Sequence, residues 1–311
     1  MTLKSNSTWL ALAVALIASL WFSEANAAKG SFEQSLSVDE PIFLNVSTGS
    51  GSISVESGPA GRVEIVGHIK VGTGLFRRSG ASAQELVDEI EANPPIELVD
   101  GQLRVGHLKG RAFKGNVSIS FEIIVPADTR VKAGTGSGSM SINSVAEIVK
   151  ASSGSGRVKL NNIAGPAVAS TGSGSIRAEG IAGAFDGDTG SGGIYLAQSA
   201  PGDIKVSTGS GGIELHSIDG ALHARAGSGR VRVNGVQNGT WDIDTGSGSV
   251  SVDLPDDAAF QLDAESSSGS IVIDHPVTVQ GKISKRHLRG DVRGGSDLLK
   301  IDTGSGGITV N

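Results

Sequence analysis

The 311-residue chain contains no cysteine and a single tyrosine, and aromatic residues make up only 4% of it. Without cysteine there is no disulfide and no thiolate metal site, which are common supports of small exported domains. Large rings normally supply much of the buried apolar area of a globular core, so their scarcity disfavours such a core. We expect small aliphatic side chains and backbone hydrogen bonds to stabilise the fold instead.

Long hydrophobic runs are also missing, apart from Leu10–Phe22 near the start of the chain. That run follows Lys4 and precedes the small-residue sequence Ala25-Asn26-Ala27, and it is too short to span a membrane. The pattern predicts a secretory signal peptide over residues 1–27, cleaved after Ala27, with no transmembrane segment in the mature chain. We therefore expect a protein of the periplasm, the extracellular space or the cell surface.

The charge balance is mildly acidic, with 26 Lys and Arg against 32 Asp and Glu and a formal net charge of −6. A protein that binds nucleic acid usually has a basic face. The composition therefore argues against a nucleic-acid partner.

Glycine is abundant, with 46 residues, and it recurs in a motif of the form Thr-Gly-Ser-Gly-(Ser/Gly)-apolar. The motif occurs at Thr48–Ile53, Thr135–Met140, Ser153–Val158, Thr171–Ile176, Thr189–Ile194, Thr208–Ile213, Ala226–Val231, Thr245–Val250, Ser266–Ile271 and Thr303–Ile308. From residue 136 to residue 246 its first glycine recurs every 18 or 19 residues. A fixed short period is typical of solenoids.

Within one repeat, apolar residues stand two apart, as at Val158 and Leu160, which indicates short strands with alternate residues facing inward. The fold class predicted is therefore all-β, a single-stranded parallel β-solenoid (a β-helix or β-roll) with coils of 18–19 residues. We expect the motif glycines to adopt positive φ at turns, and the Thr and Ser hydroxyls to form ladders between neighbouring coils.

The chain divides into the signal peptide, an N-terminal part over residues 28–116 that starts and caps the solenoid, and regular repeats over residues 117–311. The N-terminal part contains an insert with one predicted helix at about residues 82–92. Ser82 and Glu85 form a capping box at its start, and Asn93-Pro94-Pro95 ends it. Two strands joined at Asp100-Gly101 should follow. Late in the array the period is lost, so residues 275–297 are expected to be a looped-out or degraded coil.

Motifs that would indicate catalysis or metal binding are explained by the repeat itself. Asp-Thr-Gly-Ser at residues 188, 244 and 302 matches an aspartic-protease motif, but sibling repeats replace the aspartate with serine. The glycine runs open strands rather than helices, so they are not phosphate loops. The repeats lack the regular aspartate of calcium-binding rolls, and the histidines are scattered. We expect no catalytic residue, no metal and no cofactor, and hence not an enzyme.

One concentration of charge stands out in the irregular late coil. It consists of Lys282, Lys285, Arg286, Arg289 and Arg293. These residues are either a solvated loop or a contact for anionic envelope polymers or lipid head groups.

The array from Thr135 to Asn311, introduced by the sequence VSISFEIIVPADTRVKAGTGSGSM at residues 117–140, resembles the adhesin-like family of β-strand repeat proteins called domain of unknown function 4097. The resemblance extends over about residues 40–311. It implies a β-strand repeat architecture and an adhesin-like role, and it brings no catalytic residues.

Together these observations favour an exported, non-enzymatic solenoid with a binding surface for glycans or other cell-envelope components. Two alternatives remain open. One is a periplasmic component of envelope maintenance or stress response, and the other is a polysaccharide-acting β-helix enzyme. Such an enzyme would need gathered carboxylates, and the tight pairs here are Asp256-Asp257 and Asp186 with Asp188. Exposed β-edges also allow an oligomer.

Overall fold

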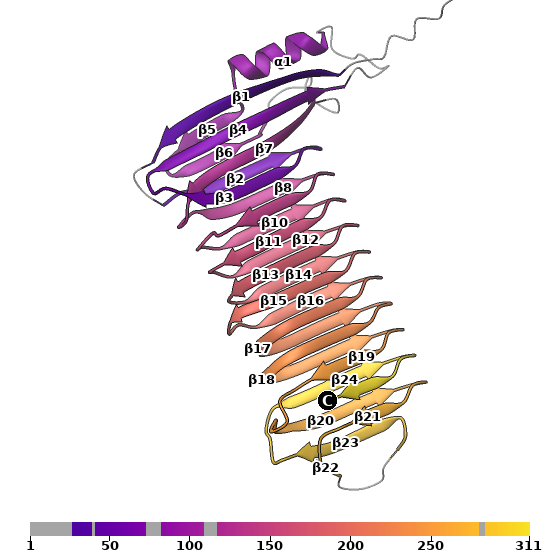
Figure 1. The fold of residues 1–311 in the computed structure, drawn as a ribbon. Helices are drawn as coiled ribbons and strands as arrows, with labels where there is room; N and C mark the ends of the chain where they lie inside the picture. The colour runs from indigo at the N-terminus through magenta and orange to yellow at the C-terminus, as the bar shows by residue number, and fades with distance from the viewer. Residues whose placement is uncertain (1–26, 39–40, 73–81, 109–116, 280–283) are drawn as a thin grey trace, which may run out of the picture.

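The computed structural model describes residues 27–38, 41–72, 82–108, 117–279 and 284–311. The predicted signal peptide, apart from Ala27, lies outside the described residues. The described residues form 25 strands and one helix, stacked into a long, regular column (Figure 1). The predicted all-β solenoid with one short helix is confirmed.

Each regular coil consists of two short strands, one on each side of a flattened column, joined through the Thr-Gly-Ser-Gly turn. Successive coils stack in parallel with the register that the period dictates. Val158 pairs with Ile176 and Ile176 with Ile194, each one repeat further along the chain. Because the register equals the repeat, equivalent side chains form rows along the column.

One side of the column is ladder A, in which neighbouring strands are hydrogen-bonded. In spatial order it comprises β5 (Ile96–Val99), β6 (Gln102–Val105), β2 (Phe43–Thr48), β8 (Arg130–Thr135), β10 (Val149–Ser153), β12 (Ala167–Thr171), β14 (Phe185–Thr189), β16 (Ile204–Thr208), the second halves of β17 (Ile213–Ala226) and β18 (Val231–Thr245), then β24 (Leu298–Thr303), β20 (Phe260–Ser266), β23 (His287–Val292) and β22 (Val277–Thr278).

The other side is ladder B. In spatial order it comprises β1 (Ala28–Ser37), β4 (Arg62–Val71), β7 (Val117–Pro126), β3 (Ile53–Gly58), β9 (Met140–Asn143), β11 (Val158–Ile163), β13 (Ile176–Ala182), β15 (Ile194–Ala200), the first halves of β17 and β18, then β19 (Val250–Asp253), β25 (Ile308–Val310) and β21 (Ile271–Ile273). Because β17 and β18 run through both ladders, the two ladders form one continuous sheet.

The core lies between the two ladders and is built from Val, Ile, Leu and Ala, as the composition predicts. Inward residues such as Val158, Leu160 and Ile176 are almost completely buried and belong to one continuous apolar cluster. Their neighbours in sequence point outward. The column therefore offers two long external faces whose side chains are free to vary without disturbing the core.

The motif glycines serve close packing, and the expectation that they adopt positive φ is wrong. Positive φ occurs at other glycines, such as Gly101 and Gly180. A Cβ at Gly156 would lie only 1.7 Å from the carbonyl oxygen of Gly138 in the preceding coil. Glycine is required because consecutive turns stack backbone on backbone, with no room for a side chain between them.

The Thr and Ser hydroxyls of the motif bond to the backbone rather than to one another, which differs from the expected hydroxyl ladder. The Thr189 hydroxyl donates to the carbonyl of Gly174 at 2.8 Å and accepts from the N–H of Gly192 at 3.2 Å. Equivalent pairs recur at Thr135, Ser153, Thr171, Thr208, Thr245, Ser266 and Thr303. Each hydroxyl ties its own turn to the preceding coil in the stack.

At the N-terminal end, the helix α1 (Ala83–Ala92) packs on β1 and β4 (Figure 1). It begins with the predicted capping box, in which Ser82 accepts from the N–H of Glu85 and Glu85 accepts from the N–H of Ser82. Strands β5 and β6 form the predicted hairpin, with positive φ at Asp100 and Gly101. The first coil, β2 and β3, is inserted between β6/β7 and β8/β9.

The C-terminal end has a similar insertion. The last coil in the sequence, β24 and β25, lies between two coils that precede it in the sequence, β18/β19 and β20/β21. The regular parallel coil is interrupted within residues 275–297, expected to be looped out or degraded: β23 pairs antiparallel with β20, and β22 pairs antiparallel with β23. On ladder B the edge strand β21 pairs only with β25 among the described strands.

Candidate functional site

The outward side chains of ladder B form rows along the column because the strands are in register. In the row formed by the second residue of each strand, Lys159 on β11 is followed by Arg177, Tyr195, Glu214 and Arg232 on the next four strands. A second row lies just before these strands. It runs Arg157, Ser175, Gly193, Gly212, Arg230 and Ser249, with each residue one coil further along.

These two rows enclose a shallow groove of about 710 Å³, which we call the basic groove. Arg157, Lys159, Arg177, Arg230 and Arg232 supply its positive charge, and Tyr195 lies in its middle. Gly193 and Gly212 stand where neighbouring coils have Ser or Arg, and their missing side chains leave the hollow. The only tyrosine of the chain is therefore one of the residues that line this groove.

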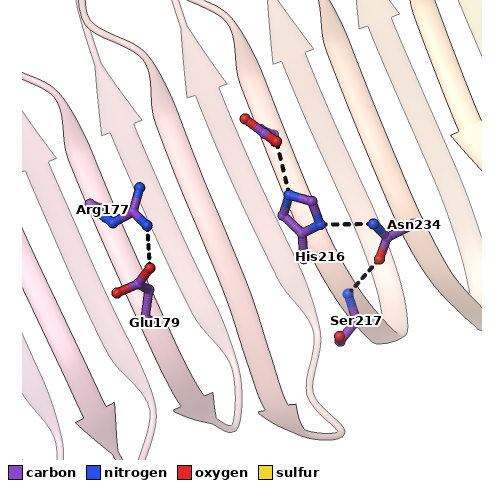
Figure 2. Close-up of polar contacts among 6 residues, drawn as sticks. Arg177, Glu179, His216, Ser217 and Asn234 are labelled. Atoms are coloured by element: carbon purple, nitrogen blue, oxygen red, sulfur yellow. Dashed lines mark hydrogen bonds and ion pairs between the residues drawn. The ribbon is translucent and has the colours of Figure 1, made fainter.

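Arg177 is held in place from two directions. Its guanidinium forms an ion pair with Glu179 on the same strand (Figure 2). It also lies over the ring of Tyr195, 4.1 Å from the ring centroid. A cation over an aromatic face is attracted by the ring quadrupole. The side chain is therefore oriented before any ligand arrives.

Beside Tyr195, a short chain of hydrogen bonds fixes the orientation of His216 (Figure 2). Asn234 accepts from the backbone N–H of Ser217 at 2.9 Å, so its amide nitrogen faces Nδ1 of His216 at 2.8 Å. An amide nitrogen only donates, so Nδ1 accepts and Nε2 carries the proton. Nε2 then donates to Glu214 at 3.0 Å.

The positive charge of the basic groove is largely uncompensated. Among the described residues, the side chains of Arg157 and Arg230 donate only to hydroxyls, Arg157 to Ser175 at 3.2 Å and Arg230 to Ser249 at 3.0 Å. Lys159 and Arg232 form no ion pair with any carboxylate in the described part of the chain. The lining contains five cationic side chains and one carboxylate, in a protein whose net charge is −6.

The predicted basic cluster is not gathered into one place. Lys282 lies outside the described residues. Lys285 and Arg286 are exposed just before β23, while Arg293 follows the other end of that strand and donates to the carbonyl of Ala258 at 3.2 Å. β23 therefore separates Arg286 from Arg293.

The fifth member of that cluster, Arg289, is engaged with Asp263 on β20 at 2.8 Å, and His287 contacts the same carboxylate at 2.9 Å. Burial alone would raise the pKa of Asp263, but the hydrogen bonds and charges of Arg289 and His287 outweigh it and lower that pKa below its ordinary value. The same contact raises the pKa of Arg289. This pair joins the edge strand β23 to the column.

The carboxylates considered for catalysis lie on the outer surface of ladder A or in a turn. Asp244 and Asp302 are register neighbours on β18 and β24, and Lys300 pairs with Asp302 at 2.8 Å. Asp186 and Asp188 point outward from β14, where Asp188 accepts from Ser207. Asp256 and Asp257 form an exposed turn. Over the described ranges, no group of three or more His, Asp or Glu side chains could hold a metal ion.

The sequence contained a signal for the basic groove that composition alone does not reveal. Aligning the repeats places Arg157, Ser175, Gly193, Gly212 and Arg230 at one alignment position. The residues two positions later form a second set. Only the register of the strands, however, establishes that the members of each set are neighbours on one face.

The geometry defines the class of protein as a parallel β-solenoid with two long external faces. The face of ladder B carries the basic groove. A family model described as Toastrack DUF4097 matches residues 99–311, about two thirds of the chain. The chain belongs to this family, as the resemblance in its sequence indicated. No curated protein matches the chain.

Two solved structures are similar to this chain. One is a candidate adhesin from Bacteroides fragilis NCTC 9343, with a TM-score of 0.38 at 12% identity, covering 91% of this chain and 98% of that chain. The other is a candidate cell adhesion protein from Clostridium sporogenes ATCC 15579, with a TM-score of 0.20 at 14% identity, covering 90% of this chain and 99% of that chain.

Proposed function

We propose that this protein is an exported, non-enzymatic solenoid with an adhesin-like role, binding glycans or other components of the cell envelope. The observation that carries the proposal is the in-register outer face of ladder B, where polar and charged side chains recur once per coil. A repeating surface suits an elongated partner, because one contact can be repeated along its length.

The arrangement of the N-terminus is compatible with export. Strand β1 begins at Ala28, directly after the predicted cleavage site, so cleavage after Ala27 would remove none of the described strands. Among the described residues, no helix is long and apolar enough to cross a membrane. N-terminal sequencing of the protein from its native host tests the cleavage, with Ala28 as the expected first residue.

The location is tested by protease accessibility of the tagged protein on intact cells and on cells with a permeabilised outer layer. Cleavage on intact cells is expected for an adhesin-like surface protein. Protection until permeabilisation would overturn surface adhesion and favour the periplasmic envelope-maintenance role instead. A full-length protein with its apolar N-terminus retained in the cytoplasm would overturn both.

A further inference from the structure

We propose that the basic groove on ladder B is a binding site for an acidic polysaccharide. This proposal rests on the proposed function and adds the location of the binding site and the chemistry of its ligand. Four of its cations, Arg157, Lys159, Arg230 and Arg232, have no carboxylate partner among the described residues, and Arg177 is oriented by Glu179 and Tyr195. Clustered cations without internal partners attract anions and are available to pair with them.

Shape favours a polymer over a small ion. The groove crosses five strands, from β11 to β18, which is about 19 Å at ~4.8 Å per strand. Its cations form two groups, Arg157, Lys159 and Arg177 on the first two coils and Arg230 and Arg232 on the last, with Tyr195 and Glu214 between them. The spacing between coils is comparable to the length of one sugar ring in an extended chain, so one acidic oligosaccharide can reach both groups of cations at once.

Neutral hydrogen-bonding groups beside the cations suit a ligand rich in hydroxyls. Ser175 and Tyr195 line the groove, and Asn161 stands one row further along the strand from Lys159. The floor at Gly193 and Gly212 exposes backbone where a chain can approach closely. A polysaccharide would use these groups together with its charges.

A single-stranded nucleic acid is less well matched by the same features. Proteins that bind such strands usually offer aromatic faces on which bases stack. The ring of Tyr195 is covered by Arg177 on one side and lies 5.2 Å from the ring of His216.

Ladder A offers a matched control. Lys132 and Lys150 are exposed neighbours on β8 and β10, and Arg225 is exposed on β17, but none of them lines the basic groove. The triple variant Arg157→Ser, Arg230→Ser and Arg232→Ser removes three charges from the groove. Serine occupies equivalent positions in the natural repeats at Ser175, Ser249 and Ser251. The triple variant Lys132→Ser, Lys150→Ser and Arg225→Ser makes the same charge change on the other face.

The experiment measures binding of the mature chain, residues 28–311, to oligogalacturonate by calorimetry at low and physiological salt. A neutral dextran oligosaccharide and a single-stranded DNA of equal charge serve as comparison ligands. We expect oligogalacturonate to bind more tightly than the two comparison ligands. Its affinity should fall as the salt concentration rises. The groove variant should lose at least about tenfold in affinity, which is about 1.4 kcal/mol, and the ladder A variant less than about twofold.

The outcomes separate the site from the function. Equal loss in the two triple variants would overturn the groove as the site while leaving a glycan-binding role. Tighter binding of the DNA would overturn the assignment to polysaccharide. If oligogalacturonate does not bind but the protein still binds intact cells or a neutral glycan, the groove proposal fails and the proposed function stands. Absence of binding to every glycan and to envelope fractions would overturn both.

Discussion

Thr171 donates a hydrogen bond from its hydroxyl to the carbonyl oxygen of Gly156, in the preceding coil, at 3.0 Å. The same hydroxyl accepts from the N–H of Gly174 at 3.1 Å. One side chain thus satisfies two buried backbone groups and joins two turns. The contact is repeated along the column, so its energetic effect can be measured by removing it in one coil and adding it in another.

The coil that begins at Ala226 lacks this contact, although Ala226 is in register with Thr208 and Thr245. Ala226→Thr should raise the free energy of unfolding by about 0.5–1.5 kcal/mol, because the new hydroxyl reaches the equivalent carbonyl and N–H. Thr171→Val should lower it by about 1–3 kcal/mol, because two buried groups lose their partner. Chemical denaturation measures both. A destabilising Ala226→Thr would show that this coil packs differently from its neighbours.

The stacked motif glycines predict that the loss of stability on replacing glycine with alanine depends on the position in the stack. A Cβ at Gly154 would lie 2.3 Å from the carbonyl oxygen of Gly136, whereas a Cβ at Gly49 meets nothing within 4 Å. Gly154→Ala should therefore cost roughly 1–3 kcal/mol through overpacking. Gly49→Ala occupies the same motif position and should be neutral or slightly stabilising. Thermal melting of the two variants checks the difference, and equal effects would contradict the close-packing explanation.

The Asp263–Arg289 pair predicts an acid-sensitive edge at β23. A carboxyl whose pKa is lower in the folded protein contributes stability above its unfolded pKa of about 3.9, and this contribution is lost as the pH falls through the folded pKa. Asp263→Asn should therefore lower the melting temperature at pH 7, and the difference from the natural protein should shrink at acidic pH. Asp257→Asn, in an exposed turn, is the control. A difference that does not depend on pH would point to packing instead of charge.

Lys285 and Arg286 remain the testable part of the predicted basic cluster, because both are exposed and Arg289 is engaged with Asp263. If they contact anionic envelope polymers or lipid head groups, Lys285→Glu with Arg286→Glu should weaken co-sedimentation with anionic envelope fractions several-fold. The fold should be unchanged, since neither side chain is buried. Unchanged co-sedimentation would leave these residues as a solvated segment.

The inserted last coil predicts that its removal destabilises residues that precede it in the chain. Deleting residues 298–311 takes β24 and β25 from between β18/β19 and β20/β21. Hydrogen exchange should then lose protection over residues 260–273, while residues 149–226 keep theirs. Preserved protection over 260–273 would mean that β20 can pair directly with β18.

Much of the fold was predictable because its signals are local. The period gave the coil length, Ser82 and Glu85 predicted the start of α1, and Asp100-Gly101 predicted the hairpin of β5 and β6. Each of these depends on residues close together in the chain. The turn chemistry was only partly predicted. Glycine appears in the sequence both where the backbone has positive φ and where a neighbouring carbonyl leaves no room for a side chain, so the sequence does not distinguish the two causes.

The stacking order and the basic groove were not predictable for a different reason. The motif at Thr303 is like the motif at Ser266, so nothing in either repeat states which one lies next to β18. The groove depends on register between five strands, and its residues are separated by whole coils in the sequence. The basic cluster near residue 285 was visible because it is contiguous, yet the structure spreads its described members along β23.

The inserted coils give this protein an order of assembly that differs from its order of synthesis. The coil of β2 and β3 lies between strands made later, and residues 298–311 fill a place between two coils made earlier. The column cannot simply grow turn by turn from its first residue as the chain emerges. Its C-terminal end closes only once residues 298–311 have been made, so the last step of folding follows translation of those residues.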